Sequence, residues 1–548
     1  MLRVRRLGTV GYREAAALQR ALARRAVDDY LLVLEHPHVF TLGVRADPAH
    51  VLVDPVSVGA ELVRSDRGGD VTYHGPGQLV LYPILTVADH PGAGREHVGR
   101  LEQVVIDALH ALGVQDAGRL PGYPGIWLGA DGPSPAKVAA IGVRVVRDGR
   151  GRRRSLHGVA LNVDCDLSMF SSIVPCGISE LPVTSLSTGH RLPIDTVADA
   201  LVQAAVASWG TAGYDDHSVT QRRPLAQPVE LASGAAERAP IRRLRQAGVD
   251  PDAAIPVSVR KPKWLRVQAR MGEEYRAVKR TLASLSLVTV CEEAGCPNIY
   301  ECWADGTATF MVNGSRCTRA CGFCLVDTRH PLPLDPDEPD RVAEAVARMD
   351  LAYAVVTCVA RDDLVDGGAG AMAATVEAIR RRRPGTTVET LISDLKGDQA
   401  ALGLVFSARP DILNHNIETV ARLQRAVRPS ANYARSLAVL ARAVDAGLVA
   451  KSGLMVGLGE TEDEVVATLA DLAAVGVSIA TVGQYLRPSA AHLPVARFWR
   501  PEEFDRLRQV GLALGLAHVE ASPLTRSSYH ARDAAAAGRG SALEVVPG

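Results

Sequence analysis

The second half of the chain alternates short β-rich runs with helical segments, and this pattern restricts the possible folds more than any other feature. The β-rich runs are 353–359, 387–393, 412–417, 452–458, 479–486 and 518–524. Between them, segments such as 340–350 and 433–446 carry apolar residues at helical spacing. Regular strand–helix alternation predicts a parallel sheet that forms a complete or partial barrel. In such barrels the reactive side chains gather at the carboxyl ends of the strands.

Six of the nine cysteines lie within 34 residues, just before these runs. They form two triplets, Cys291, Cys296 and Cys302, and then Cys317, Cys321 and Cys324. The second triplet, C-T-R-A-C-G-F-C, has the spacing Cys-x3-Cys-x2-Cys. Three thiolates can hold three irons of a [4Fe–4S] cluster and leave the fourth iron open to a small chelating ligand. This open position is typical of radical S-adenosylmethionine (SAM) enzymes, in which the cofactor carries the difficult chemistry.

A structural zinc site is the alternative explanation of these cysteines. Zinc sites favour four nitrogen or sulfur ligands, commonly in paired C-x2-C knuckles, and neither triplet has a histidine placed as a fourth ligand. Disulfides are not expected either. The chain begins MLRVRRLGTV, without the apolar core of a signal peptide, so we expect a cytoplasmic protein in a reducing compartment.

The length of 548 residues predicts roughly two to four domains. Residues 1–290 contain only two cysteines, Cys165 and Cys176, so the cluster-like spacing is confined to the later part of the chain. Residues 221–256 are rich in Pro, Ala and Arg and lack a sustained apolar period, which predicts a linker. We therefore expect one domain at 1–220 and a second at 257–548. A formal net charge of zero and the lack of a long apolar span predict neither a nucleic-acid partner nor a membrane helix.

The N-terminal half gives weaker signals by itself. Residues 30–43 and 78–87 predict strands, and 96–112 has the pattern of an amphipathic helix. The chemical candidates are Cys176, Lys137 and His74. A cysteine nucleophile needs a neighbour that lowers its pKa or takes its proton, and lysine can do either. For each residue taken alone we favour the structural explanation, which is burial of the cysteine and surface exposure of the lysine.

The C-terminal motifs are specific when they are taken in order. CEEAGCPNIYECW, CTRACGFC, RDDLVDGG, HNIETV, KSGLMVGLGET, VGQYLRPS and RSSYHA together resemble the lipoyl synthase family from about Lys261 to the C-terminus. The resemblance implies that Cys317, Cys321 and Cys324 hold the radical-SAM [4Fe–4S] cluster. It also implies an auxiliary [4Fe–4S] cluster held by the first triplet and a serine, which we assign to Ser528 with Ser527 as second choice. We expect SAM to be contacted by Gly367, Gly368, Asn416 and Glu418.

The family's reaction is the replacement of hydrogen by sulfur at C6 and C8 of a protein-bound octanoyl chain, which yields lipoyl. The resemblance implies that a radical derived from SAM removes the hydrogens, that the auxiliary cluster gives up the sulfurs, and that ferredoxin or flavodoxin supplies electrons. Two positions depart from the family pattern. Cys358 stands where serine is more frequent, and we expect a buried small residue there. Val365 stands where proline is common, and we expect little effect.

The N-terminal motifs RGGDVTYHGPGQLVLYP, PGIW, KVAAIGVRV, LHGVALNVD and PCGI resemble the lipoyl(octanoyl) transferase family over about residues 8–220. The resemblance implies that Cys176 takes octanoyl from octanoyl-acyl carrier protein as a thioester. The group then passes to a lysine of a lipoyl carrier domain, in 2-oxoacid dehydrogenases or the glycine cleavage H protein. Lys137 would activate Cys176 and move protons. The acyl channel would be lined by Arg67, Gly68, Gly69, Asp70, Val71, Thr72, Tyr73, His74, Ala140, Ile141, Gly142, Gly158, Val159 and Ala160.

Other residues of this half are expected to be structural. His157 and Cys165 have no partner that the sequence identifies. The arginines Arg147, Arg150, Arg152, Arg153 and Arg154 are expected at a hairpin tip. We favour a solvated loop there. The alternative is a docking surface for an acidic acyl carrier protein, where complementary charge would raise the association rate.

The expected architecture is α/β with two catalytic domains. These are an N-terminal domain like the biotin and lipoate protein ligases and a C-terminal radical SAM partial (β/α) barrel. The expected function is bifunctional lipoate biosynthesis, with octanoyl transfer followed by insertion of two sulfurs. Two alternatives remain. One half could be inactive and serve only to dock carrier proteins, or the chain could be a zinc-stabilised scaffold without catalysis.

Overall fold

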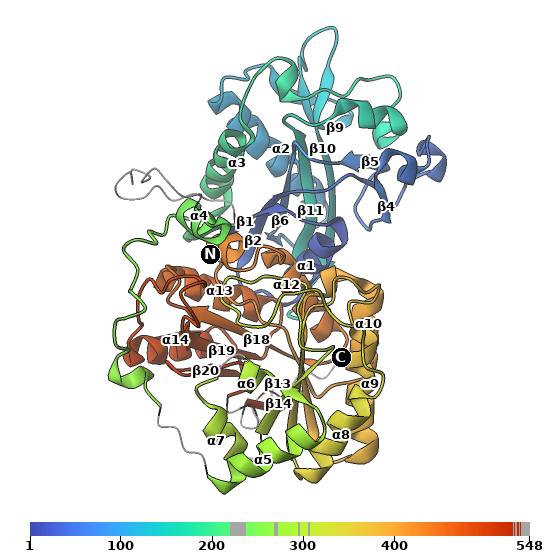
Figure 1. The fold of residues 1–548 in the computed structure, drawn as a ribbon. Coiled ribbons are helices and arrows are strands. Elements are labelled where there is room, and N and C mark those ends of the chain that lie inside the picture. The colour runs from blue at the N-terminus through green and yellow to red at the C-terminus, as the bar shows by residue number, and fades with distance from the viewer. Residues whose placement is uncertain are drawn as a thin grey trace. The chain divides into compact units, whose positions relative to one another are not determined.

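The computed structural model describes residues 1–219, 237–267, 272–293, 296–304 and 307–529, with 531, 534, 535 and 538. The chain divides into two compact units, Met1–Thr220 and Gln221–Gly548 (Figure 1). Of the predicted linker, residues 221–236 lie outside the described residues. Its later part includes helix α4 (Ala239–Gln246), which packs against helix α11 (Gln424–Val427) and buries Leu244. This part of the predicted linker is therefore folded onto the C-terminal unit.

The first unit is built on a mainly antiparallel sheet with the strand order β12-β1-β2-β6-β11-β10-β9-β8, in which β7 also pairs with β11. The strands are β1 (Leu2–Thr9), β2 (Asp29–Glu35), β6 (Gln78–Ile84), β7 (Thr86–Val87), β8 (Ala117–Leu120), β9 (Tyr123–Leu128), β10 (Ala136–Arg147), β11 (Arg153–Asn162) and β12 (Tyr214–Ser218). Strand β1 runs parallel to β2 and β12. A second, three-stranded sheet contains β3 (Val39–Leu42), β4 (Glu61–Arg64) and β5 (Val71–His74).

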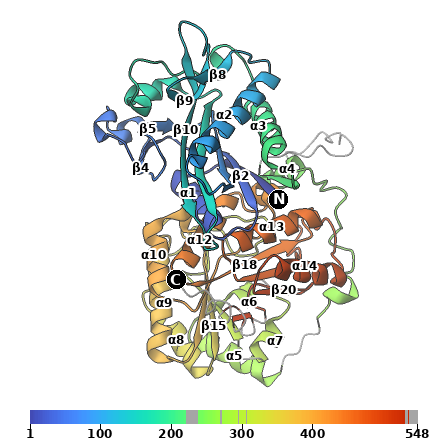
Figure 2. The ribbon, with the colours of Figure 1, turned by 180° about the vertical axis from the view of Figure 1, so that it is seen from behind.

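Three long helices cover the large sheet of the first unit. Helices α2 (Ala93–Ala111) and α3 (Ile194–Trp209) lie side by side (Figure 2), and α2 packs on β8, β9 and β10. Helix α1 (Tyr12–Arg25) packs against β6 and β11. The helix predicted at 96–112 is α2. The strand predicted at 30–43 divides into β2 and β3, because the segment between them leaves the large sheet for the small one.

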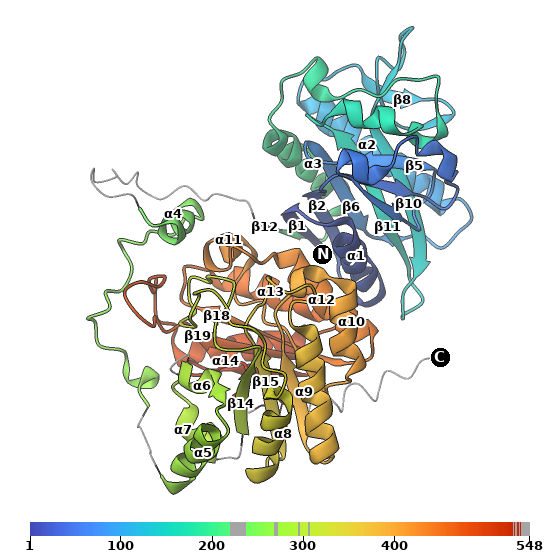
Figure 3. The ribbon, with the colours of Figure 1, turned by 45° about the vertical axis from the view of Figure 1, so that its right-hand side comes forward.

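The second unit contains an eight-stranded sheet in sequential order, in which β14 to β20 are parallel and β13 pairs antiparallel with β14 (Figure 3). The strands are β13 (Val288–Thr289), β14 (Thr307–Val312), β15 (Tyr353–Cys358), β16 (Thr387–Leu391), β17 (Ile412–Asn414), β18 (Val449–Val456), β19 (Ile479–Gln484) and β20 (His518–Ala521). The helices are α5 (Glu273–Ser284), α6 (Val290–Glu293), α7 (Ile299–Ala304), α8 (Glu338–Arg348), α9 (Ala369–Arg382), α10 (Gln399–Ser407), α12 (Tyr433–Asp445), α13 (Glu462–Ala474) and α14 (Pro501–Ala513). The predicted partial (β/α) barrel is confirmed.

All six predicted β-rich runs contain a strand, and the helices predicted at 340–350 and 433–446 are α8 and α12. In the run 412–417, β17 ends three residues early, at Asn414. Two features lie just beyond the end of this strand. Glu418 has a positive φ of 64°, and Arg428 Nη1 donates to the carbonyls of Asn416 and Ile417, each at 2.8 Å. These carbonyls therefore do not take part in the sheet ladder.

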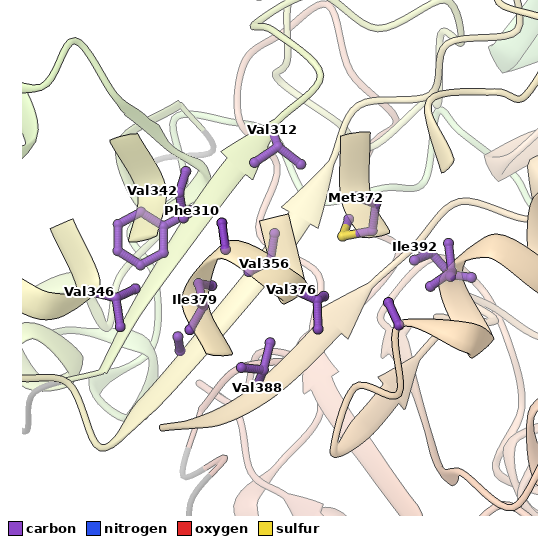
Figure 4. Close-up of a cluster of buried hydrophobic side chains, with 14 of the residues drawn as sticks. Phe310, Val312, Val342, Val346, Val356, Met372, Val376, Ile379, Val388 and Ile392 are labelled. Atoms are coloured by element: carbon purple, nitrogen blue, oxygen red, sulfur yellow. The ribbon is translucent and has the colours of Figure 1, made fainter. Parts of the chain in front are cut away.

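The apolar core of the second unit lies between strands and their covering helices. Figure 4 shows Phe310 and Val312 of β14, Val356 of β15 and Val388 of β16 close to side chains of α8 and α9. A buried ion pair of this unit joins β16 and β18, the strands on either side of β17. Lys451 Nζ lies 3.0 Å from both carboxylate oxygens of Glu389, and both side chains are almost completely buried. Among the described residues, no helix has the length and apolar character needed to cross a membrane.

Candidate functional sites

A cavity of about 400 Å³ lies in the first unit, beside strands β5, β6, β10 and β11. Cys176 and Lys137 both line it. The wall includes most of the predicted channel, namely Arg67, Gly68, Gly69, Asp70, Thr72, His74, Ala140, Ile141, Gly142, Gly158, Val159 and Ala160. The segments 140–142 and 158–160 pair directly across β10 and β11. Gly158 cannot carry a side chain without moving the backbone, because a Cβ atom there would lie 2.1 Å from the carbonyl oxygen of Leu81.

The prediction that Val71 and Tyr73 line the acyl channel is wrong, since neither lines this cavity. Both belong to β5, where successive side chains point to opposite faces. Thr72 and His74 face the cavity, whereas Val71 and Tyr73 belong to a separate apolar cluster. The Tyr73 ring lies 5.3 Å from the ring of Phe170 in that cluster. The sequence motif marked the segment but could not separate its two faces.

Cys176 lies in a tight turn, Pro175–Gly177, with a left-handed backbone φ of 57°. Residues other than glycine seldom adopt this conformation, and it persists where the surrounding contacts impose it. Here Val174 N donates to His50 O at 2.8 Å just before the turn. A Cβ atom on Gly177 would lie 2.7 Å from Asp70 Oδ2, so the carboxylate is in close contact with the turn. Asp70 is itself bound to His50 Nδ1 at 2.6 Å.

The segment after the turn connects Cys176 to the strand that carries Lys137. Lys137 N donates to Pro182 O, and Thr184 N donates to Lys137 O, both at 2.9 Å. The Lys137 side chain is buried, and its Nζ lies 4.8 Å from the centroid of the Trp127 ring. Within the described part of the chain, no carboxylate pairs with this ammonium group. An amine without a carboxylate partner is suited to exchanging protons with a nearby thiol.

Arg67 places a buried positive charge on the cavity wall. Its guanidinium donates to Thr41 O at 2.6 Å, to Thr41 Oγ1 and to Gly68 O. Burial lowers the pKa of Arg67, and no carboxylate among the described residues forms an ion pair with it. A guanidinium held only by neutral acceptors favours negative charge that develops inside the cavity.

Uncharged histidine and tyrosine rings form another part of the cavity wall and of the layer behind it. Of the rings described here, the sequence predicted only His74. Burial lowers the pKa of His36 to about 4 and that of His74 well below its usual value, so both rings are uncharged near pH 7. His36 Nδ1 donates to Val10 O at 2.7 Å, and the resulting tautomer lets its Nε2 accept from Tyr82 OH at 2.8 Å. Tyr12 and Tyr82 line the cavity beside His74. Such a neutral wall suits an apolar chain.

His157 is a wall residue as well as a structural one. It lines the cavity, and its Nε2 lies 2.8 Å from Asp66 Oδ1. The hydrogen bond to His157 holds the pKa of Asp66 at about 2. Cys165, in contrast, is buried in the apolar cluster beneath the small sheet, and burial raises its pKa to about 12. The thiol of Cys165 is therefore protonated and unreactive near neutral pH.

The arginine group near the β10–β11 hairpin is mostly paired. Arg147 and Arg153 each lie within 4 Å of Asp89, and Arg152 pairs with Asp148 at 2.7 Å. Arg154 is not a solvated residue as expected. It is fully buried, pairs with Asp29 at 2.7 Å, and donates to main-chain carbonyls. The structure thus leaves little unpaired positive charge on this hairpin for docking an acidic protein.

In the second unit, the second cysteine triplet follows β14 at the carboxyl end of the parallel strands. Cys317, Cys321 and Cys324 are partly exposed, free thiols. Hydrogen bonds attach their loop to three other segments: Thr318 N donates to Ala360 O at 3.0 Å, Gly322 N to Val427 O at 2.9 Å, and Leu493 N to Gly322 O at 2.9 Å. The three thiols are thus fixed near the ends of several strands.

The environment of this triplet fits a metal cluster. Burial raises the pKa of Cys321 to about 12 and that of Cys324 to about 11. Thiolates are therefore costly at this site unless a cation accompanies them, and iron supplies that positive charge. Arg428 supplies a second cation close to Cys321 and lowers the pKa of that thiol in opposition to burial.

Residues around the loop offer contacts to a polar cofactor. Gly367 and Gly368 have positive φ values, and a Cβ atom on Gly368 would lie 2.3 Å from Asn313 Nδ2. Asn313 donates to Gly368 O at 3.2 Å, while its Oδ1 is buried without a hydrogen-bond partner. Asn416 Oδ1 is likewise buried and unpartnered. Two orphaned acceptors at the strand ends fit a ligand rich in N–H and O–H donors, as SAM is. The sequence did not identify Asn313.

Glu418, the remaining residue expected to contact SAM, follows Asn416 beyond β17. Its carboxylate lies close enough to Cys321 and Cys324 to raise the pKa of both thiols. Burial raises the pKa of Glu418 itself. Cys358 ends β15 and is partly exposed, not fully buried as expected. Burial raises its pKa to about 11, and the neighbouring Cys317 adds to the shift.

The first cysteine triplet meets the C-terminal serine motif. Asn298 Nδ2 donates to Leu524 O at 2.8 Å, and Tyr529 OH lies 3.2 Å from Glu301 Oε1. These contacts bring the turn with Ser527 and Ser528 against the segment that carries Cys291, Cys296 and Cys302. They do not distinguish the two serines. In the described ranges, no three His, Cys, Asp or Glu side chains are grouped as a single-ion site.

Three family models match the sequence. Residues 11–206 match the lipoyl protein ligase A/B catalytic domain. Residues 254–296 match the N-terminal domain of lipoyl synthase of the radical SAM family, and residues 311–472 match the radical SAM superfamily. The two halves of the chain therefore match different families, in agreement with the expected architecture.

The chain is similar to curated lipoyl synthases and to solved lipoate protein ligases. Lipoyl synthase of Rubrobacter xylanophilus is 56% identical over 275 residues, which cover 50% of this chain and 86% of that protein. Lipoyl synthase of Mycobacterium leprae is 55% identical over 272 residues, or 50% and 87% of the two chains. A bi-partite lipoate protein ligase from Thermoplasma acidophilum shares 20% identity over 39% of this chain and 85% of its own. Its TM-score against this chain is 0.33.

Proposed function

Since this chain belongs to the lipoyl synthase family and also contains a lipoyl protein ligase A/B catalytic domain, we propose that it builds protein-bound lipoyl groups in two consecutive steps. It is an enzyme of lipoate biosynthesis. In the first step the N-terminal unit transfers octanoyl from octanoyl-acyl carrier protein to a lysine of a lipoyl carrier domain. In the second, the C-terminal unit inserts sulfur at C6 and C8 of that octanoyl group.

The cavity shared by Cys176 and Lys137 is the observation that carries the first step. The side-chain amine of Lys137, in its uncharged form, takes the proton of the Cys176 thiol, and the thiolate attacks the thioester carbonyl of the donor. The carrier thiolate leaves with the proton returned by Lys137, and octanoyl remains on Cys176. Attack by the carrier-domain lysine then forms the amide and frees the thiol. The positive charge of Arg67 stabilises the oxygen that becomes negative in both attacks.

A ligase that activates the acyl group with ATP is the competing function for this domain. Cys176 favours transfer, because a chain that forms an acyl thioester needs a nucleophile and a chain that adenylates the acid does not. The neutral rings around the cavity also suit an octanoyl chain better than a triphosphate.

The second step rests on the two cysteine triplets. We assign Cys317, Cys321 and Cys324 to one [4Fe–4S] cluster, and the first triplet with Ser528 to a second. Gly367, Gly368, Asn416 and Glu418 are assigned to contacts with SAM. Together the bound cluster and SAM would supply the radical chemistry that an unactivated C–H bond requires. The chain's own part is to hold these groups at the strand ends and to admit the octanoyl-lysine there.

The two steps share a partner, since the octanoylated carrier domain is the product of the first and the substrate of the second. Connecting the sites in one chain raises the local concentration of the second site around a carrier still bound to the first. An electron donor such as ferredoxin or flavodoxin completes the set of partners. A carrier released to solution remains a competent substrate, so the connection does not require direct transfer between sites.

An anaerobic assay on the reconstituted full-length chain tests both steps at once. The chain receives octanoyl-acyl carrier protein, SAM, a reductant and an apo carrier domain, and the carrier's mass is followed. We expect an octanoyl shift and then a shift for two added sulfurs. Cys176→Ser should remove the first shift but still convert a carrier that already bears octanoyl. If Cys176→Ser leaves octanoyl transfer by the cell unchanged, this half only docks carriers.

Metal analysis of the same sample separates the radical enzyme from a scaffold. Two cube clusters contain about eight irons per chain and colour the protein brown. Colourless protein with one or two zinc ions would instead support the scaffold.

A further inference from the structure

Arg319 lies between the first two cysteines of the second triplet, and two carboxylates hold its guanidinium. Its Nε and Nη2 each donate at 2.8 Å to the two carboxylate oxygens of Asp362. Its Nη1 lies 2.7 Å from Asp394 Oδ1. The Arg319 side chain is 6% exposed and that of Asp394 is 0% exposed. The arginine therefore makes three charge-assisted contacts in a place largely closed to water.

The two carboxylates come from different loops at the carboxyl end of the sheet. Asp362 follows β15, in the loop that continues to Gly367 and Gly368, and Asp394 follows β16. Asp362 is also joined to the cysteine loop by its main chain, because its N donates to Thr318 Oγ1 at 3.0 Å. Lys396 Nζ donates to Asp362 O at 2.9 Å from the β16 loop. Three segments that are far apart in sequence thus meet around one guanidinium.

The positive charge of Arg319 is needed to balance the negative charges of Asp362 and Asp394. Asp394 also lies 3.5 Å from Arg435, but its contact with Arg319 is shorter, at 2.7 Å. A planar fork can satisfy one carboxylate through two parallel bonds and a second carboxylate from its other edge. A lysine ammonium, which is a compact point charge, cannot reproduce that geometry.

From these contacts we propose that Arg319 is a positioning residue for the cofactor site. By joining Asp362 and Asp394, it fixes Cys317 and Cys321 relative to the glycine loop that contacts SAM. This inference rests on the proposed radical-SAM function of the second unit. The guanidinium itself acts through the loops and not on the substrate, so its loss should disturb how SAM meets the cluster more than whether a cluster forms.

The test compares Arg319→Lys with Arg506→Lys in the reconstituted full-length chain. Arg506 is a matched control because it makes a two-pronged pair with Glu462, at 3.1 and 3.0 Å, on the exposed surface of α14. The measurements are iron per chain, the dissociation constant of SAM, and the electron paramagnetic resonance (EPR) spectrum of the reduced cluster with and without SAM. None of them depends on turnover.

We expect Arg319→Lys to keep near wild-type iron, to bind SAM at least tenfold more weakly, and to lose part of the spectral change caused by SAM. Arg506→Lys should match the wild type in all three. Wild-type SAM affinity and wild-type spectra in Arg319→Lys would overturn the inference. A wild-type chain that forms no [4Fe–4S] signal at all would overturn the proposed function with it.

A second variant covers the case in which Arg319→Lys does not fold. Arg319→Met with Asp394→Asn removes the guanidinium and the fully buried charge together, which avoids an unpaired carboxylate in the interior. The same weakening of SAM binding is expected from it. Unchanged SAM affinity in this folded double variant would equally contradict the role assigned to Arg319.

Discussion

At the scale of single residues, the contacts of Lys137 separate two possible roles. Its Nζ lies over the Trp127 ring, and no carboxylate among the described residues pairs with it. A residue in that position could act by its charge alone or by giving and taking protons. The two roles predict different rates of octanoyl transfer for a variant that keeps the positive charge but cannot exchange its proton.

Lys137→Arg keeps the positive charge and can still stack on Trp127, but a guanidinium does not deprotonate near neutral pH. We expect octanoyl transfer to fall by about 10²–10⁴-fold in both Lys137→Arg and Lys137→Met, which is the usual contribution of acid–base catalysis. Cys165→Ala, which changes an unreactive buried thiol, is the control and should transfer normally. Near-normal rates for Lys137→Arg would show that charge alone is needed.

The buried pair Lys451–Glu389 gives a second prediction at this scale. Tyr353 OH and Asn414 Nδ2 also donate to the Glu389 carboxylate, at 2.6 and 3.0 Å. Lys451→Met leaves that carboxylate without its cation in the interior, and we expect the free energy of unfolding to fall by about 3–5 kcal/mol. Adding Glu389→Gln should recover most of the loss. Urea unfolding of the full chain, followed at the transition of the second unit, measures both values.

At the scale of elements, helix α13 begins with a complete capping box. Thr461 Oγ1 accepts from Glu464 N at 3.3 Å, and Glu464 Oε2 accepts from Thr461 N at 2.8 Å. The same carboxylate binds Arg422, which also donates to Ala247 O just beyond α4. The start of one helix is therefore linked to the end of another that the sequence had assigned to a linker.

Thr461→Ala removes the cap acceptor, and we expect a loss of about 1 kcal/mol in the free energy of unfolding. Thr461→Ser keeps the hydroxyl and should cost much less. Hydrogen exchange of the first-turn amides of α13 provides the local measurement. Equal protection in the alanine and serine variants would show that the cap contributes nothing to this helix.

At the scale of the whole molecule, buried neutral histidines make stability depend on pH. Burial lowers the pKa of His36, His97 and His415 to about 4. Below about pH 6.5 the unfolded chain takes up protons on these rings, while the folded chain does not until about pH 4. The free energy of unfolding should therefore fall as pH decreases across this range. Each histidine contributes up to about 1.4 kcal/mol per pH unit.

The test is the urea midpoint of each unit's transition between pH 7 and pH 5. His97→Gln should make the decrease shallower in the first unit and leave the second unit unchanged. His90→Gln, at an exposed position, controls for the substitution itself. An unaltered pH dependence in His97→Gln would show that His97 is not protonated on unfolding in this range.

The sequence by itself determined the order of strands and helices in the second unit, because hydrophobic periodicity and glycine-marked turns are local properties of the chain. It also determined the two cysteine triplets and the Cys176 and Lys137 motifs, since each is a short string with specific chemistry. Strand β14 was not predicted, because it lies between the two triplets and the cysteine spacing dominates the pattern there. The predicted end of β17 was wrong: Arg428, 12 residues after Asn416, binds the carbonyls just beyond the strand.

Only the tertiary structure decided which side of each element faces a site. Val71 and Tyr73 turn away from the cavity because a strand alternates its faces and the motif does not show its orientation. Arg154 is buried and Arg319 joins two loops because their carboxylate partners come from distant segments. Ion pairs and cavity walls depend on contacts between residues far apart in sequence, which a local pattern cannot encode. Residue identity set the chemistry, and long-range packing set where that chemistry is assembled.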